Sequence, residues 1–98
     1  MHLVKLEPSP LSTKKWKATF EDPKHTTHFG AKGYVDFTIL SAKHDPTAEE
    51  HKKRYRQRHE KDLTTNNPVS PGYMSYYILW NKPTIKASLA DYKHRFNL

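Results

Sequence analysis

Apolar and polar side chains alternate along residues 14–20, with Trp16, Ala18 and Phe20 at every second position. This period of two predicts a strand with one buried face. An Asp-Pro pair follows and favours a turn. The next segment, residues 25–29, contains two threonines and an aromatic residue and predicts a second strand, antiparallel to the first.

A third strand is expected over residues 34–40, which include Tyr, Val, Phe, Thr and Ile, all of which favour β structure. Gly30 and Gly33 flank the turn before it, where glycine adopts a positive φ at least cost. Together the three segments predict an antiparallel meander between residues 14 and 40.

Residues 1–13 depart from this pattern because they contain Pro8 and Pro10. Proline prevents a helix and is disfavoured in a central strand. We therefore expect an extended arm, and its apolar residues are candidate anchors: Leu3, Val4, Leu6 and Leu11.

Residues 45–62 predict a helix with a largely polar surface. Asp45 is suited to capping, Pro46 to the first helical position, and Thr47 with Glu50 offers a second capping box. Acidic residues come early and basic residues late, which is the order that complements the helix dipole. Few apolar residues share one face, so this helix is either solvated or docked on a partner.

Residues 84–96 give the clearest helical pattern, with Ile85, Leu89, Tyr92 and Phe96 on one face. We expect this helix to form a hairpin with the segment before it.

That preceding segment, residues 71–81, is apolar on nearly every side. Ser70 and Pro71 suit the start of a helix, whereas Gly72 lowers helix propensity. A strand therefore remains the alternative to a helix here.

These elements place the chain in the α+β class. The expected fold is a small antiparallel β-meander followed by a basic helix and a C-terminal helical hairpin. The extended Pro-containing arm occupies residues 1–13, and residues 14–98 form a single small domain. A chain of 98 residues has enough material for one modest core.

Composition changes this picture mainly through charge. The chain has 17 Lys and Arg residues against 10 Asp and Glu, a formal net charge of +7, which suits nucleic acid, a membrane surface or an acidic protein. The absence of cysteine excludes disulfides, zinc–thiolate sites and cysteine nucleophiles. We expect no transmembrane segment, because no apolar stretch approaches the roughly 20 residues that a spanning helix needs.

The densest basic run, KKRYRQR at residues 52–58, has two interpretations. It lies along phosphates and releases counterions, or it is a solvated helix face balanced by acids such as Glu49 and Glu50, four residues before Lys53 and Arg54. Under the first interpretation the candidate partner-binding residues are Lys52, Lys53, Arg54, Tyr55, Arg56 and Arg58.

The segment between residues 73 and 80 carries too many aromatic side chains for one helix face. Tyr and Trp are enriched at interface hot spots, so four more candidate partner-binding residues are Tyr73, Tyr76, Tyr77 and Trp80. The alternative is that this segment is the central element of the core.

No residue pattern predicts catalysis, a metal or a cofactor. His25 and His28 would point to opposite faces of a strand, and His51 and His59 would lie about 12 Å apart along a helix. Neither pair therefore predicts a metal site. The chain also lacks a nucleophile elbow, a phosphate-binding Gly-rich loop and a metalloprotease motif. We expect a protein that is not an enzyme.

Five motifs follow one another along most of the chain: KKWKATF at 14–20, HFGAKGYVDFT at 28–38, RYRQRH at 54–59, LWNKPT at 79–84 and DYKHRF at 91–96. This combination resembles a family of short proteins, without an established activity, that large DNA viruses of algae and protists encode. The resemblance implies a protein carried in the virion, and present in the host cytoplasm or nucleus during assembly.

From the resemblance and the missing catalytic motifs, we expect a minor capsid or cement protein that bridges neighbouring capsid proteins in a large hetero-assembly. The alternative is a basic nucleic-acid-binding protein for viral DNA packaging or condensation. In that case the basic helix would contact phosphate.

Overall fold

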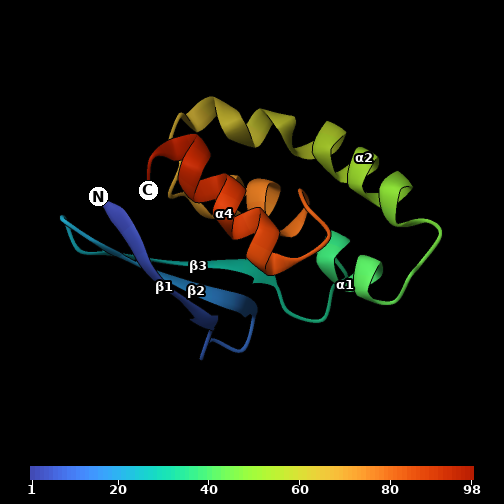
Figure 1. Cartoon of the computed structure of the whole chain (residues 1–98), viewed down its shortest axis with the longest axis horizontal. Coiled ribbons are helices and arrows are strands. Elements are labelled where there is room, and N and C mark those ends of the chain that lie inside the picture. Colours follow the sequence, from blue (N-terminus) through green and yellow to red (C-terminus); the bar gives the residue numbers. More distant parts are fainter.

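The computed structural model describes all residues from 1 to 98 and has an α+β fold, as the sequence predicts. Three antiparallel strands form the sheet in the order β1-β2-β3: β1 is His2–Pro8, β2 is Lys14–Glu21 and β3 is His25–Ala31. Figure 1 shows the helices stacked over one face of this sheet, with the two termini close together at one end.

The helical part begins with α1, which leaves the end of the sheet, and continues through α2 to the C-terminal helix. The bounds are Phe37–Ala42 for α1, Ala48–His59 for α2, Glu60–Thr65 for the 3₁₀ helix η1, Pro71–Met74 for α3, Ser75–Leu79 for the π-helical turn η2 and Ile85–Phe96 for α4. None of these helices has both the length and the apolar character needed to cross a membrane.

The prediction that residues 34–40 form the third strand is wrong, since Asp36 turns the chain into helix α1. The Asp36 side chain caps this helix by accepting a hydrogen bond from the Ile39 amide, at 3.1 Å. Phe37 and Leu40 then lie one turn apart and are both buried. Burial on a helical spacing, together with the cap, outweighs the β preference of these residues.

The third strand comes instead from the segment expected to be an extended arm. His2–Pro8 is extended, but it pairs with β2, so that Leu3 lies opposite Phe20 and Leu6 opposite Ala18. Pro8 is tolerated because it is the last residue of an edge strand. The Leu3 amide also donates to the Leu98 carbonyl, at 2.8 Å, so both ends of the chain belong to the domain.

Within segment 71–81, residues 71–79 are helical, which excludes the strand alternative. Ser70 caps α3 by accepting from the Tyr73 amide, and Pro71 occupies the first turn as predicted. The chain continues directly into the π-helical η2, which packs against α4 in the predicted hairpin.

The core lies between the sheet and this hairpin. Its fully buried members include Phe20 and Phe29 from the sheet, and Met74, Ile78 and Tyr92 from the helices. Burial raises the pKa of Tyr92, whose hydroxyl donates to the Pro68 carbonyl at 2.7 Å. Aromatic rings and aliphatic side chains thus both contribute to the core.

Helix η2 approaches the sheet closely at Gly30. This residue has a φ of +80°, and a Cβ placed on it would lie 2.8 Å from Leu79 Cδ1. Glycine is required here both by the positive φ and by the space that Leu79 occupies.

We predict that Gly30→Ala lowers the free energy of unfolding by about 1–3 kcal/mol, through backbone strain and the Leu79 contact. Gly33→Ala is the matched control, because Gly33 has a φ of +90° but no atom within 4 Å of its Cβ position. Urea unfolding of both variants separates the effect of backbone strain from that of the Leu79 contact. Equal losses in the free energy of unfolding would show that the Leu79 contact contributes nothing.

Candidate functional site

The basic run at residues 52–58 does not form one continuous basic surface, because α2 turns part of it towards the core. Arg56 donates from Nη1 to the Trp80 carbonyl at 2.8 Å and to the Tyr76 carbonyl at 3.3 Å. Its guanidinium also lies 4.0 Å from the centre of the Tyr76 ring. Arg56 therefore attaches α2 to the end of η2 and is occupied within the chain.

Lys52 and Tyr55 face the same way as Arg56. The Lys52 Nζ lies 4.7 Å from the centre of the Phe37 ring, and burial lowers the pKa of this amine. The Tyr55 ring stacks between His59 and Trp80, with centroid distances of 4.1 and 4.5 Å, and burial raises its pKa. Half of the six residues predicted to bind a partner through α2 thus pack this helix on its own domain.

The other three, Lys53, Arg54 and Arg58, are exposed. Arg54 pairs with Glu50, four residues earlier, at 3.1 Å. Other acidic residues, Glu49 and Glu60, are exposed on or beside the same helix. This arrangement supports the solvated-face interpretation of the run.

The aromatic residues predicted to bind a partner are covered by the chain itself. Tyr73, Tyr76 and Trp80 are each only 8 % exposed. Tyr77 is half-buried and contacts the ring of Phe96, with centroids 5.0 Å apart. These four side chains therefore belong to the central element of the core, the alternative that the sequence left open.

The structure instead reveals two open clefts, one on each side of the loop between β3 and α1. We call this loop, residues 32–36, the Tyr34 loop. The first cleft, the α2 cleft, has a volume of about 500 Å³ and lies between the Tyr34 loop and α2. The second, the α1 cleft, has a volume of about 480 Å³ and is lined by Trp16, Ile39 and Lys43 together with the Tyr34 loop.

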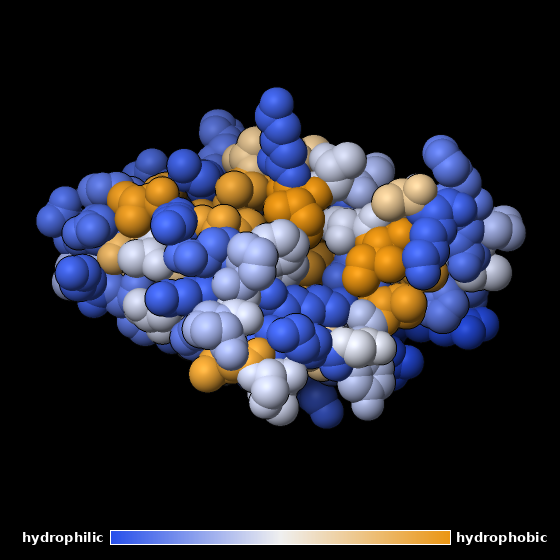
Figure 2. Space-filling view, turned by 90° about the horizontal axis from the view of Figure 1, so that it is seen from below, coloured by the Kyte–Doolittle hydropathy of each residue, from blue (hydrophilic) through white to orange (hydrophobic).

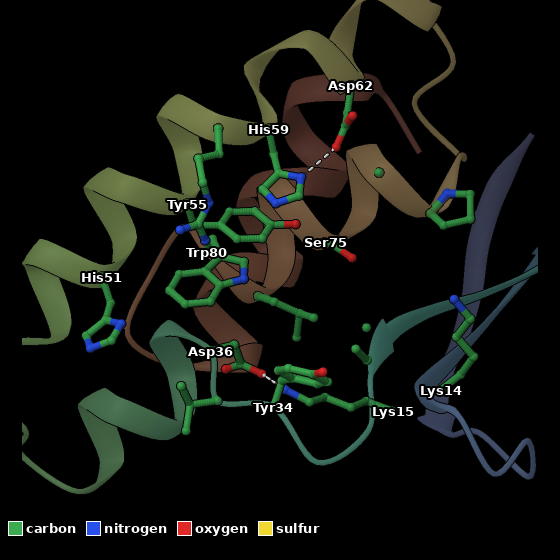
Figure 3. A pocket seen from close by; sticks show the side chains of 17 residues that line it. Lys14, Lys15, Tyr34, Asp36, His51, Tyr55, His59, Asp62, Ser75 and Trp80 are labelled. Carbon is green, nitrogen blue, oxygen red and sulfur yellow. Dashed lines mark hydrogen bonds and ion pairs between the residues drawn. The ribbon is translucent and has the colours of Figure 1, made fainter.

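Tyr34 lies between the two clefts and lines both of them. Its side chain is 73 % exposed, and its neighbour Val35 is 44 % exposed. Figure 3 shows Tyr34 on one side of the α2 cleft, with the stacked Tyr55 and Trp80 on the other side. An aromatic ring this exposed contributes little to the core and is available to a ligand.

The base of the Tyr34 loop is fixed by the buried Asp36. Its carboxylate pairs with Lys15 Nζ at 2.7 Å and accepts hydrogen bonds from Thr38 and from the Ile39 amide. Because Asp36 is only 2 % exposed, these partners compensate a charge that would be costly to bury alone. The loop is therefore anchored directly beside its exposed tyrosine.

Lysine and arginine outnumber carboxylates in the lining of both clefts. The only carboxylates are Asp36, paired with Lys15, and Asp62, paired with His59 at 2.9 Å. The remaining lining cations make no ion pair within the chain: Lys14 and Arg58 in the α2 cleft, and Lys32 and Lys43 in the α1 cleft. Unpaired cations around concave surfaces attract anionic ligands.

The His59–Asp62 pair lies at the edge of the α2 cleft. Ser75 lines the same cleft, but the only side-chain hydrogen bond of His59 goes to Asp62. No group of three or more His, Cys, Asp or Glu side chains is placed to ligate a metal ion. His25 and His28 bond separately, to Thr27 and Ser9.

The fold and the site thus define a small α+β protein with two cation-lined clefts around an exposed tyrosine. Residues 4–59 match the model of a family of unknown function, DUF5754, and the chain belongs to this family. The match includes most of β1, β2, β3, the Tyr34 loop, α1 and α2. Neither a curated protein nor a solved structure matches the chain.

The sequence contains a signal for the Tyr34 loop, although the β-favouring residues at 34–40 predict a strand there. Tyr34 and Val35 follow a Gly-flanked turn and precede Asp36, a good helix cap. The unpaired state of Lys14, Lys32 and Lys43 had no sequence signal, because it depends on which acids the fold brings near them.

We predict that Arg56→Ala lowers the free energy of unfolding by about 1.5–3 kcal/mol, because two carbonyl groups lose a charged donor. Arg54→Ala and Arg58→Ala, which remove exposed cations from the same helix, should change it by less than about 0.5 kcal/mol. Denaturant unfolding of the three variants measures this difference. Equal losses would show that Arg56 is as dispensable to the fold as its exposed neighbours.

Proposed function

We propose that this protein is a non-enzymatic nucleic-acid-binding protein, and that the two clefts beside Tyr34 form its contact surface. The observation that carries the proposal is the gathering of four unpaired cations around one exposed aromatic ring. Cations supply the sequence-independent attraction to phosphate, and aromatic rings supply stacking on bases.

This proposal places three of the four phosphate contacts outside the basic run of α2. Lys52 and Arg56 are engaged inside the domain, and Arg54 is paired with Glu50. Arg58 is the one cation of the run that also lines a cleft. The lysines that surround the Tyr34 loop come from β2, the loop itself and the end of α1.

A second candidate function is the minor capsid or cement protein that the viral resemblance implies. What favours it is apolar surface on and beside edge strand β1: Met1, Val4 and Leu11 are 41 %, 49 % and 45 % exposed. Val4 is the extra residue at a register shift, between the pairs formed by Leu3 and Lys5. Figure 2 shows apolar side chains in separate patches on the face seen from below. Such patches suit contacts with neighbouring proteins.

The first test measures the affinity for labelled DNA oligonucleotides as a function of salt. Because each single-strand phosphate contact contributes about 0.7 to the salt slope, Lys14→Ala/Lys32→Ala/Lys43→Ala should reduce the slope by about 2. The matched control is Lys53→Ala/Lys61→Ala/Lys86→Ala, which has the same net charge and removes exposed lysines outside the clefts. The proposal fails if the wild-type protein does not bind the oligonucleotides at low salt. It also fails if the two triple variants show equal reductions in the salt slope.

The second candidate is tested by the protein composition of washed virus particles. If the protein is a cement component, it should be present, and Val4→Ser/Leu11→Ser should reduce its incorporation severalfold by removing exposed apolar contacts. Thr19→Ser, an exposed-face change within β2, should leave incorporation unaltered. Absence of the wild-type protein from washed particles would exclude this role.

A further inference from the structure

We propose that the clefts accept a single strand rather than a duplex, with one base stacked on Tyr34 and the flanking phosphates on the four unpaired cations. This inference rests on the proposed nucleic-acid function and specifies the form of the ligand. It depends on the shape of the site, on the free face of one ring and on the distribution of charge.

The Tyr34 ring projects from a support that is held on both sides. Before it, Gly33 has a φ of +90°, and the Tyr34 amide donates to the Ala31 carbonyl at 3.3 Å. After it, Asp36 is buried and paired with Lys15. A ring presented from a fixed backbone loses little conformational entropy when a base stacks on it.

The other aromatic residues of the α2 cleft have no comparable free face. Tyr55 is stacked on both sides, by His59 and by Trp80, as Figure 3 shows. Trp80 itself is only 8 % exposed. Tyr34 is therefore the ring of this cleft that a base can cover.

The unpaired cations lie on both sides of Tyr34. Lys14 and Arg58 line the α2 cleft, whereas Lys32 and Lys43 line the α1 cleft. A strand that crosses the Tyr34 loop therefore passes from one pair of cations to the other while its base lies at the ring. This is the combination of backbone attraction and base stacking that characterises single-strand binding.

The shape of the surface disfavours a duplex. Proteins that read duplex DNA in its major groove insert a convex helix or β-ribbon, whereas this site consists of two concavities of about 500 and 480 Å³. Volumes of this size suit small groups such as a nucleotide. In a duplex the bases are stacked on one another and leave no face for Tyr34.

The test compares three ligands at low salt: an oligothymidylate of about 12 nucleotides, an abasic strand of the same length, and a duplex of that length. The oligothymidylate should bind the wild-type protein most tightly. Tyr34→Ala should weaken that binding about 5- to 150-fold and remove the preference over the abasic strand, which retains the phosphates. Tyr34→Phe should preserve the preference, because it keeps the ring.

Thermal unfolding of both Tyr34 variants verifies that they are folded. If oligothymidylate and abasic strand bind the wild-type protein equally, or if Tyr34→Ala keeps the preference, the stacking inference is wrong and the proposed phosphate-binding function stands. Tighter binding of the duplex would likewise overturn the inference alone. If none of the three ligands binds, the inference and the proposed function both fail.

Discussion

The arrangement of the sheet and the helices depends on the contacts of one buried carboxylate, that of Asp36. It lies where the chain leaves the sheet, and it pairs with Lys15 of β2 while capping α1. These two bonds set the direction in which the helical layer departs from β3. They also fix the base of the Tyr34 loop, which lines both clefts. A buried acid with a cation and several hydrogen-bond donors is stable, whereas the same acid without its cation would carry a large desolvation cost.

A second constraint is the attachment of a very polar helix to a small core. Helix α2 has few apolar residues, and it is packed through the stem and head of Lys52, the ring of Tyr55 and the guanidinium of Arg56. Long basic side chains can cover apolar surface while their charged ends meet carbonyls or aromatic faces. For this reason a dense basic run in the sequence does not translate into an equally basic surface. Among the cations that remain unpaired, Lys14, Lys32, Lys43 and Arg58 line the clefts beside the Tyr34 loop.

The division of labour within the chain follows from these constraints. The C-terminal hairpin supplies about half of the buried aromatic residues, and its rings contact one another and the side chains of α2. The sheet, the Tyr34 loop and the end of α1 supply the exposed ring and three of the four unpaired cations that line the clefts, and all of these residues lie within the part that the family model matches. The C-terminal half thus contributes mainly to stability, and the N-terminal half contributes most of the proposed binding residues. Helices α2 and η2 also line one wall of the α2 cleft.

Local physical signals in the sequence determined the α+β class, two of the three strands, the basic helix and the C-terminal hairpin. Alternation at 14–20, the cap at Ser70 and the stripe from Ile85 to Phe96 act over a few residues, so they can be recognised without the fold. The tertiary structure decided that His2–Pro8 is a strand and 37–42 a helix, because pairing with β2 and the Lys15–Asp36 contact join residues far apart in the chain. It also decided the site, since the availability of a cation or a ring depends on its neighbours in space. Tyr34 is exposed and Tyr76 is buried, because the Arg56 side chain of α2 packs on the Tyr76 ring while the Tyr34 ring lies open between the clefts.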